Sequence, residues 1–210
     1  MDVKSNYESF NLPLDTIWSD IDYMDAYKDF TYDPVDYADL PQFVDDIHKQ
    51  NYQYIPILDA GIAQRENQNY SAYDSGKEMN VFIKAWENGP DFTGEVWPVD
   101  AVYPNFFHQK TTEWWHQNLD DFYRKIKFDG LWQDMNEASN FCNGACYSNQ
   151  MYGTPTRHKI PYTPTGRNLE TKSMPLDAYH PSDPVDRNIT ELDAHSLFGT
   201  MQVKASHEWF

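Results

Sequence analysis

Three short apolar segments constrain the fold of this chain most strongly, because an aspartate ends or directly follows each of them. We expect β-strands at Leu14–Asp20, at Tyr52–Leu58 before Asp59, and at Gly130–Gln133 before Asp134. Helical patterns separate these strands, and such alternation is typical of an α/β fold with parallel strands, either an open sheet or a β/α barrel. Because parallel strands end at one edge, we expect the aspartates to contribute to one site.

Two segments between the strands show clear helical periodicity. One covers Ala38–Gln50 and the other Thr112–Lys127. Their expected buried faces are Leu40, Phe43, Val44 and Ile47 in the first helix, and Trp115, Leu119, Phe122, Tyr123 and Ile126 in the second. We also expect the end of a helix at 3–11, a small hairpin pairing 81–84 with 95–96 around a turn at 88–91, and a helix at 192–210.

Composition places the chain in the globular class and sets limits on its partners. It has 210 residues, of which 40% are hydrophobic and 16% aromatic, and a formal net charge of −17. This predicts one domain covering 1–210, with a long irregular loop at about 147–190, where Pro, Thr, Asn and Asp are frequent. The acidity argues against nucleic acid or an anionic membrane surface as a partner. No apolar run reaches the ~20 residues of a membrane span.

Cysteines and sequons indicate an oxidising compartment. Cys142 and Cys146 are the only cysteines, and they favour a local disulfide over free thiols or zinc, which would require two further ligands. The triplets that begin at Asn69 and Asn188 fit N-glycosylation. Residues 1–15 lack the features of a signal peptide. We therefore expect an internal piece of a lysosomal or secreted parent protein.

The segment Asp129–Phe141 carries the chemistry. On a strand, Trp132 and Asp134 project to the same side while Gln133 points away. An indole can pack against the apolar face of a pyranose, and a carboxylate beside it can attack or stabilise an oxocarbenium-like centre. The histidines show no ligand spacing and the chain has no glycine-rich phosphate loop, so we expect no metal, nucleotide or redox cofactor.

This segment resembles the nucleophile motif Trp-x-Asp-Met-Asn-Glu of glycoside hydrolase family 31, the α-glucosidase family. Other signatures of that family appear in the same order and spacing. They are Pro13–Asp25, Asp29–Thr31, Ile55–Ile62 and Val96–Pro98. The resemblance covers the chain from about Val3 to the C-terminus and is weakest between Gly153 and Asp186. It implies a partial (β/α)8 TIM barrel, with these strands as the second to fourth of the eight.

The resemblance also implies retaining hydrolysis of α-glycosidic bonds, releasing glucose from the non-reducing end of maltose- or starch-type substrates. Asp134 matches the nucleophile, and Glu137 follows it as a residue that could tune Asp134 or orient a sugar hydroxyl. The positions that match substrate-binding residues of the family are Asp20, Ile21, Asp59, Trp97, Trp132 and Met135. Gln133 and Val99 depart from the family pattern, which usually has an apolar residue and a glycine there.

The acid/base aspartate of the family belongs to a segment that these 210 residues do not contain. We therefore expect the isolated chain to be inactive or nearly so, and to require the missing parts of its own barrel as partners, besides an oligosaccharide or small α-glucoside. Two functional classes stay open at this point. The chain is part of a hydrolase, or it is a non-catalytic carbohydrate-binding or inert remnant that has the nucleophile half of the site.

Overall fold

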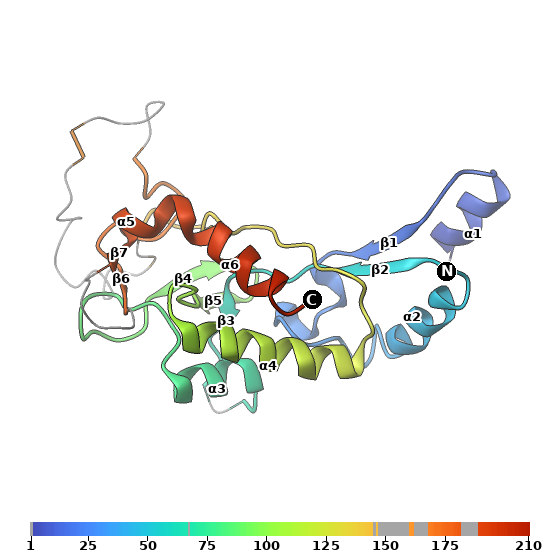
Figure 1. Ribbon diagram of the computed structural model, residues 1–210, viewed down its shortest axis with the longest axis horizontal. Coiled ribbons are helices and arrows are strands. Elements are labelled where there is room, and N and C mark those ends of the chain that lie inside the picture. The colour runs from blue at the N-terminus through green and yellow to red at the C-terminus, as the bar shows by residue number, and fades with distance from the viewer. Residues whose placement is uncertain (1, 67, 145, 147–159, 162–167, 182–188) are drawn as a thin grey trace.

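The computed structural model describes residues 2–66, 68–144, 146, 160–161, 168–181 and 189–210. The molecule is elongated, with α1 at one end and the β6–β7 pair near the other (Figure 1). The α-helices are α1 (Asp2–Ser9), α2 (Leu40–His48), α3 (Ser71–Met79), α4 (Gln109–Lys125), α5 (Glu191–Ala194) and α6 (Phe198–His207). The strands are β1 (Thr16–Ser19), β2 (Gln53–Pro56), β3 (Ile62–Ala63), β4 (Thr93–Val96), β5 (Val99–Val102), β6 (Tyr179–His180) and β7 (Ile189–Thr190).

Three parallel segments lie side by side in chain order, as the alternation of strands and helices predicts. β1 pairs with β2 in parallel, and Ile57, just after β2, forms a parallel bridge with Trp132. The Trp132 N–H donates to the Pro56 carbonyl at 3.0 Å, and the Leu58 N–H donates to the Trp132 carbonyl at 2.9 Å. The third segment is shorter than expected, since it pairs as a bridge rather than as a strand over Gly130–Gln133.

The hairpin prediction was wrong. Residues 95–96 belong to β4, which pairs antiparallel with β5 in the sheet order β3-β5-β4. The chain reverses between Val96 and Val99, so Trp97 and Pro98 form the turn. The segment around Asn88 does turn back, and Lys84 bridges Asp91, but Lys84 also bridges Tyr179. The turn signal at 88–91 was therefore correct, whereas the assignment of its strand partner was not.

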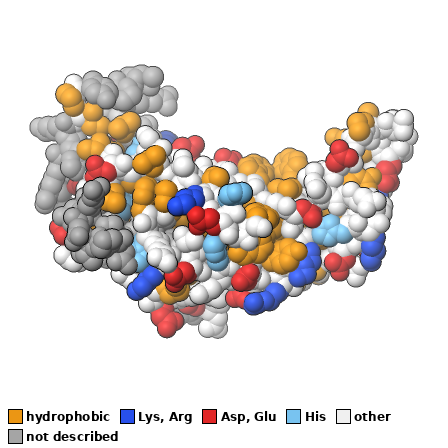
Figure 2. Space-filling view, in the orientation of Figure 1, with side chains coloured by type: hydrophobic (Ala, Val, Ile, Leu, Met, Phe, Trp, Pro, Cys, Tyr) orange, Lys and Arg blue, Asp and Glu red, His pale blue; other side chains and the backbone are white. Residues whose placement is uncertain are grey.

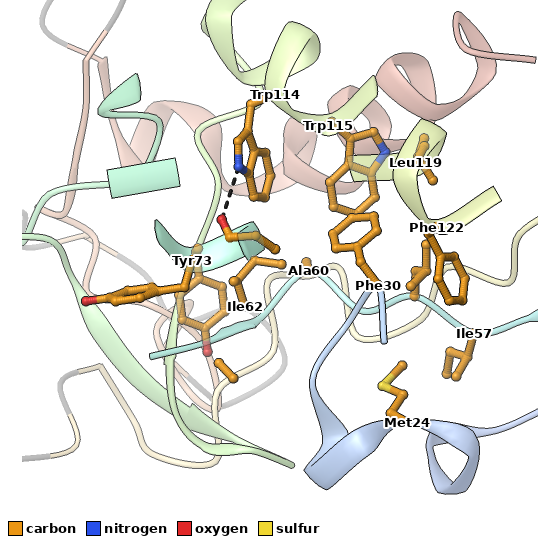
Figure 3. Close-up of a cluster of buried hydrophobic side chains, with 14 of the residues drawn as sticks. Met24, Phe30, Ile57, Ala60, Ile62, Tyr73, Trp114, Trp115, Leu119 and Phe122 are labelled. Carbon is orange, nitrogen blue, oxygen red and sulfur yellow. Dashed lines mark hydrogen bonds between the residues drawn. The ribbon is translucent and has the colours of Figure 1, made fainter. Parts of the chain in front are cut away.

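Helix α4 supplies much of the buried core (Figure 3). Trp115, Leu119, Phe122 and Ile126 are fully buried as expected, but Tyr123 is 36% exposed, which corrects its assignment to the buried face. Trp114 is fully buried on the adjacent face, where its Nε1–H donates to the Ala72 carbonyl of α3 at 3.1 Å. Because α4 also packs against α3 on this adjacent face, its buried face is wider than the predicted stripe.

The expected C-terminal helix is divided. It consists of α5, the 3₁₀ turn η4 (His195–Leu197) and α6, which runs back over the body of the molecule (Figure 1). Just before it, β6 pairs with β7. Most of the loop expected at 147–190 lies outside the described residues, but its described part includes β6 and β7. Among the described residues, none of the helices has the length and apolar character needed to cross a bilayer.

Candidate active site

Three aspartates stand at the carboxyl ends of the parallel segments. Asp20 directly follows β1, Asp59 follows β2 by three residues, and Asp134 follows the Trp132 bridge by two. The register of the parallel pairs brings these ends to one edge. Burial, together with the negative charges of Asp134 and Asp20, raises the pKa of Asp59 to about 7. This electrostatic coupling places the three carboxyl groups within one site.

Asp134 is exposed, and its own loop holds it. Its Oδ1 accepts a hydrogen bond from the Met135 N–H at 2.8 Å, and Met135 adopts a left-handed backbone with φ of 56°. The Met135 carbonyl in turn accepts from the Ser139 N–H at 2.8 Å. One carboxylate oxygen is therefore fixed by the main chain, while the exposed side chain stays open to a reacting partner.

Asp20 is built in a similar way at the end of β1. It is exposed, and its Oδ1 accepts from the Ile21 N–H at 2.8 Å, which caps the 3₁₀ helix η1 (Ile21–Tyr23). The buried Tyr23 then anchors this turn, since its hydroxyl donates to the Ile57 carbonyl at 2.7 Å. Ile21 is half-buried against the core, so only part of its surface is available as a wall for a ligand.

Asp59 differs from both, because it is only 6% exposed. Its Oδ1 is buried and has no hydrogen-bond partner within the described part of the chain. Its main-chain N–H donates to Oδ1 of Asp29 at 2.8 Å. A buried carboxyl oxygen without a partner costs free energy unless it is protonated or a ligand supplies a donor.

Aromatic side chains border these carboxyl groups. Trp132 is half-buried and meets Trp18 edge to face, with ring centroids 5.1 Å apart. Trp97, at 47% exposure, donates from Nε1 to the Met135 Sδ at 3.0 Å. The structure thus brings together Trp97 and Met135, which the sequence places in separate motifs. Trp18 was missed by the sequence analysis, although its spacing to Asp20 is the same as that of Trp132 to Asp134.

Glu137 occupies a different wall from the three aspartates. It is exposed and lines an open groove together with residues of η4 and α6. The other residues of that groove are Asn136, His195, Ser196, Gly199, Thr200 and Val203. This position fits a role in shaping the loop after Asp134, and the assignment of Glu137 as a catalytic residue stays a prediction.

A buried asparagine organises the loop beyond Glu137. Asn140 is fully buried, and its Oδ1 accepts from the Glu95 N–H at 2.9 Å while its Nδ2 donates to the Gly144 carbonyl at 2.6 Å. It therefore ties this loop to β4. Sequence reasoning did not single it out, because a lone asparagine after a motif carries no signal of burial. The predicted disulfide Cys142–Cys146 is confirmed, with Cα atoms 5.1 Å apart.

The two departures from the family pattern have structural counterparts. Gln133 points away from Trp132 and Asp134, and its Nε2 donates to Oγ of Ser206 on α6 at 2.5 Å. The same hydroxyl accepts from Trp115 Nε1 at 2.8 Å, so the half-buried amide is satisfied. Val99 has a φ of 75°, a conformation that favours glycine and is strained for a β-branched residue.

The described residues include one group of potential metal ligands and the first of the two sequons. Glu95 lies close enough to both cysteine sulfurs to form a candidate metal cluster, but the sulfurs are bonded to each other and offer no thiolates. Asn69 is exposed in a turn, which is compatible with glycosylation. Asn188 lies outside the described residues.

Several known proteins are similar to this chain in sequence. A model of the glycosyl hydrolases family 31 TIM-barrel domain matches residues 1–210. An α-glucosidase of Hordeum vulgare is 37% identical over 207 residues, which is 97% of this chain and 22% of that protein. Alpha-xylosidase 1 of Arabidopsis thaliana is 36% identical over 232 residues, covering 99% of this chain and 24% of that protein.

A solved structure agrees. The crystal structure of a Glc1Man2-bound glucosidase II alpha subunit superposes with a TM-score of 0.76 at 25% identity, and the match covers 99% of this chain and 19% of that one. The chain thus spans about a fifth of the length of these relatives. Its strand-end aspartates, parallel segments and full-length family match show that the chain belongs to glycoside hydrolase family 31, as a segment of the TIM-barrel domain.

Proposed function

We propose that this chain supplies the nucleophile half of a retaining α-glucosidase site. The observation that carries the proposal is the exposed Asp134 at a strand end, beside Trp132 and electrostatically coupled to Asp59. The relatives named above include an α-glucosidase and an α-xylosidase, so glycoside hydrolysis is the activity of the family around it. Within that activity, we propose maltose- or starch-type α-glucosides as substrates and glucose, from the non-reducing end, as product.

In this mechanism, a carboxylate oxygen of Asp134 attacks the anomeric carbon as the bond to the leaving oxygen breaks. The glycosyl ester that forms is then cleaved by water, which restores the Asp134 carboxylate and retains the configuration. A general acid must protonate the leaving oxygen and then activate the water. We propose that this acid lies in a part of the barrel outside these residues.

The remaining groups of the site bind the sugar. Asp20 and Asp59 present carboxyl oxygens at the same edge as Asp134, and each can accept hydrogen bonds from pyranose hydroxyls. Trp97, Trp132, Met135 and Ile21 supply apolar surface for the sugar ring. The disulfide supports placing the parent protein in a lysosomal or secreted compartment.

A covalent labelling experiment tests this proposal. The chain replaces its matched segment in the Hordeum vulgare α-glucosidase, and the chimaera is treated with a slow fluorinated α-glucosyl donor that carries an activated leaving group. We expect mass spectrometry of peptides to locate the label on Asp134. Glu137→Gln should slow turnover and leave the label in place. A label on Glu137, Asp20 or Asp59 contradicts the assignment, and an active chimaera that is never labelled contradicts the covalent mechanism.

A further inference from the structure

Asp29 stands out among the buried groups that the mechanism above does not use. Its residue is 1% exposed, and its side chain reaches from the loop after β1 to the end of β2. Oδ1 of Asp29 accepts the main-chain N–H of Asp59 at 2.8 Å. This is the hydrogen bond that fixes the backbone from which the Asp59 side chain projects, and it joins segments 30 residues apart.

The loop around Asp29 is itself held firmly. The Tyr70 hydroxyl donates to the Asp29 carbonyl at 2.9 Å, in a fully buried contact. The next residue, Phe30, packs edge to face on Trp115 with ring centroids 5.0 Å apart, inside the aromatic core (Figure 3). The main-chain carbonyl of Asp29 and the residue that follows it are thus both anchored, so the carboxyl group has little freedom to follow a shift of Asp59.

We propose that Asp29 is a positioning residue for sugar binding: its buried carboxyl group holds the Asp59 main chain and thereby aims the Asp59 carboxyl group at a hydroxyl of the bound glucose unit. This inference rests on the proposed function, because it deepens the role given to Asp59. Asp29 acts through Asp59 and needs no contact with the sugar. Oδ1 of Asp59, which has no hydrogen-bond partner among the described residues, is the atom that a sugar hydroxyl would satisfy.

Electrostatics explain how an acidic residue can serve here without disrupting the site. Burial raises the pKa of Asp29 well above its usual range, and the charge of Asp59 raises it further. Among the described residues, the other titratable groups that interact electrostatically with this buried carboxyl are the hydroxyls of Tyr23 and Tyr70, which carry no charge at neutral pH. A protonated Asp29 still accepts the Asp59 N–H on Oδ1 and adds no negative charge beside Asp59, Asp20 and Asp134.

Equilibrium binding of glucose tests the proposal without requiring turnover. In the chimaera described above, Asp29→Asn retains an acceptor oxygen and is neutral, whereas Asp29→Leu has a similar size and no acceptor. We expect Asp29→Leu to raise the dissociation constant of glucose about tenfold. We expect the dissociation constant of glucose for Asp29→Asn to stay within about twofold of the parent value. The change of this dissociation constant with pH on the acid side of the profile should be the same as in the parent.

Phe30→Leu is the matched control, because it loosens the same loop without touching the Asp59 N–H. It should lower the melting temperature and leave the dissociation constant of glucose nearly unchanged. Unchanged binding in Asp29→Leu overturns the proposal, as does a loss in Asp29→Asn or Phe30→Leu as large as that in Asp29→Leu. A chimaera that binds glucose but does not hydrolyse an α-glucoside counts against the proposed function alone, because the binding comparison stands.

Discussion

The end of β2 and the end of the Trp132 segment are neighbours with opposite surroundings. Asp59, after β2, is buried and has a carboxyl oxygen to which the described residues donate no hydrogen bond, while Asp134 is exposed and fixed by the next main-chain N–H. Burial raises the pKa of Asp59 to about 7. The pair shows that position at a strand end does not define the role of a carboxyl group, because solvent and hydrogen bonding set its charge.

This contrast allows a second interpretation of Asp59. A buried carboxyl with a raised pKa beside an exposed one is also the pattern of an acid and a nucleophile. The two interpretations differ in what they require of the substrate. A general acid matters most when the leaving group is poor, whereas a sugar-binding carboxyl matters equally for good and poor leaving groups.

The largest effect is expected at Asp134. In the active chimaera, Asp134→Asn should lower kcat by about 10⁴-fold or more, because the amide is a poor nucleophile and carries no charge for the transition state. Steady-state kinetics with an aryl α-glucoside measure the loss. The near-isosteric, exposed substitution should leave the melting temperature within a few degrees of the parent. Activity above a hundredth of the parent value would be incompatible with a nucleophile at this position.

A smaller loss is expected at Asp59, and its dependence on the substrate is diagnostic. Asp59→Asn should lower kcat/KM by about 10- to 100-fold, as expected for one or two charge-assisted hydrogen bonds. The loss should be the same for an activated aryl α-glucoside and for maltose. If maltose hydrolysis falls much further than hydrolysis of the aryl substrate, Asp59 acts as the general acid for Asp134 and not only as a sugar-binding carboxyl.

The buried carboxyl group of Asp59 should make the stability of the folded protein depend on pH. A carboxyl whose pKa rises from 3.8 to about 7 on folding stabilises the folded state below 3.8, and this contribution is lost as the pH rises to about 7. The full effect is about 4 kcal/mol at most. Asp59→Asn should therefore melt above the parent temperature, by a small margin at pH 5 and by a larger one at pH 8.

Glu113→Gln is the control for that experiment, because Glu113 is exposed on α4 and is not among the charges that raise the pKa of Asp59. Its difference in melting temperature from the parent should be similar at both pH values. A pH-independent difference for Asp59→Asn would show that water or a neighbouring group compensates the buried charge of Asp59.

The sequence was sufficient for the strand-end aspartates and for α4, because both depend on local pattern. Period-2 alternation places Trp132 and Asp134 on one side, and the contact of Gln133 with Ser206 on the other side agrees. Tyr123 shows the limit of this reasoning. It fits the apolar stripe of α4, yet it lies at the edge of the core, next to Trp209 near the C-terminal end of α6, where apolar side chains gather on the surface (Figure 2).

Contacts between distant segments were not predictable from pattern. Helix α3 has few apolar residues and was missed, since it is held by tertiary packing: a Cβ at Gly76 would lie 2.3 Å from the Phe82 ring. The bond from Asp59 to Asp29 likewise links two motifs whose proximity depends on the fold. Alternation can place a side chain on a face, but it does not specify which loop covers that face.

The smallest effect concerns the turn that brings Trp97 to Met135, on the Asp134 side of the comparison. Val99 directly follows this turn with a φ of 75°, and the Pro98 carbonyl accepts a hydrogen bond from Arg65 at 2.6 Å. Val99→Gly should relieve strain of about 1–2 kcal/mol, offset by about 0.5–1 kcal/mol of chain entropy, and so stabilise the protein slightly.

Val35→Gly is the control, because Val35 is 81% exposed without a positive φ, and there the glycine should only destabilise. Thermal unfolding of both variants measures the difference, and fluorescence quenching of the tryptophans reports whether Trp97 becomes less exposed. Destabilisation by Val99→Gly as large as that by Val35→Gly would mean that the left-handed residue carries no strain, and that this turn holds Trp97 as well with valine as with glycine.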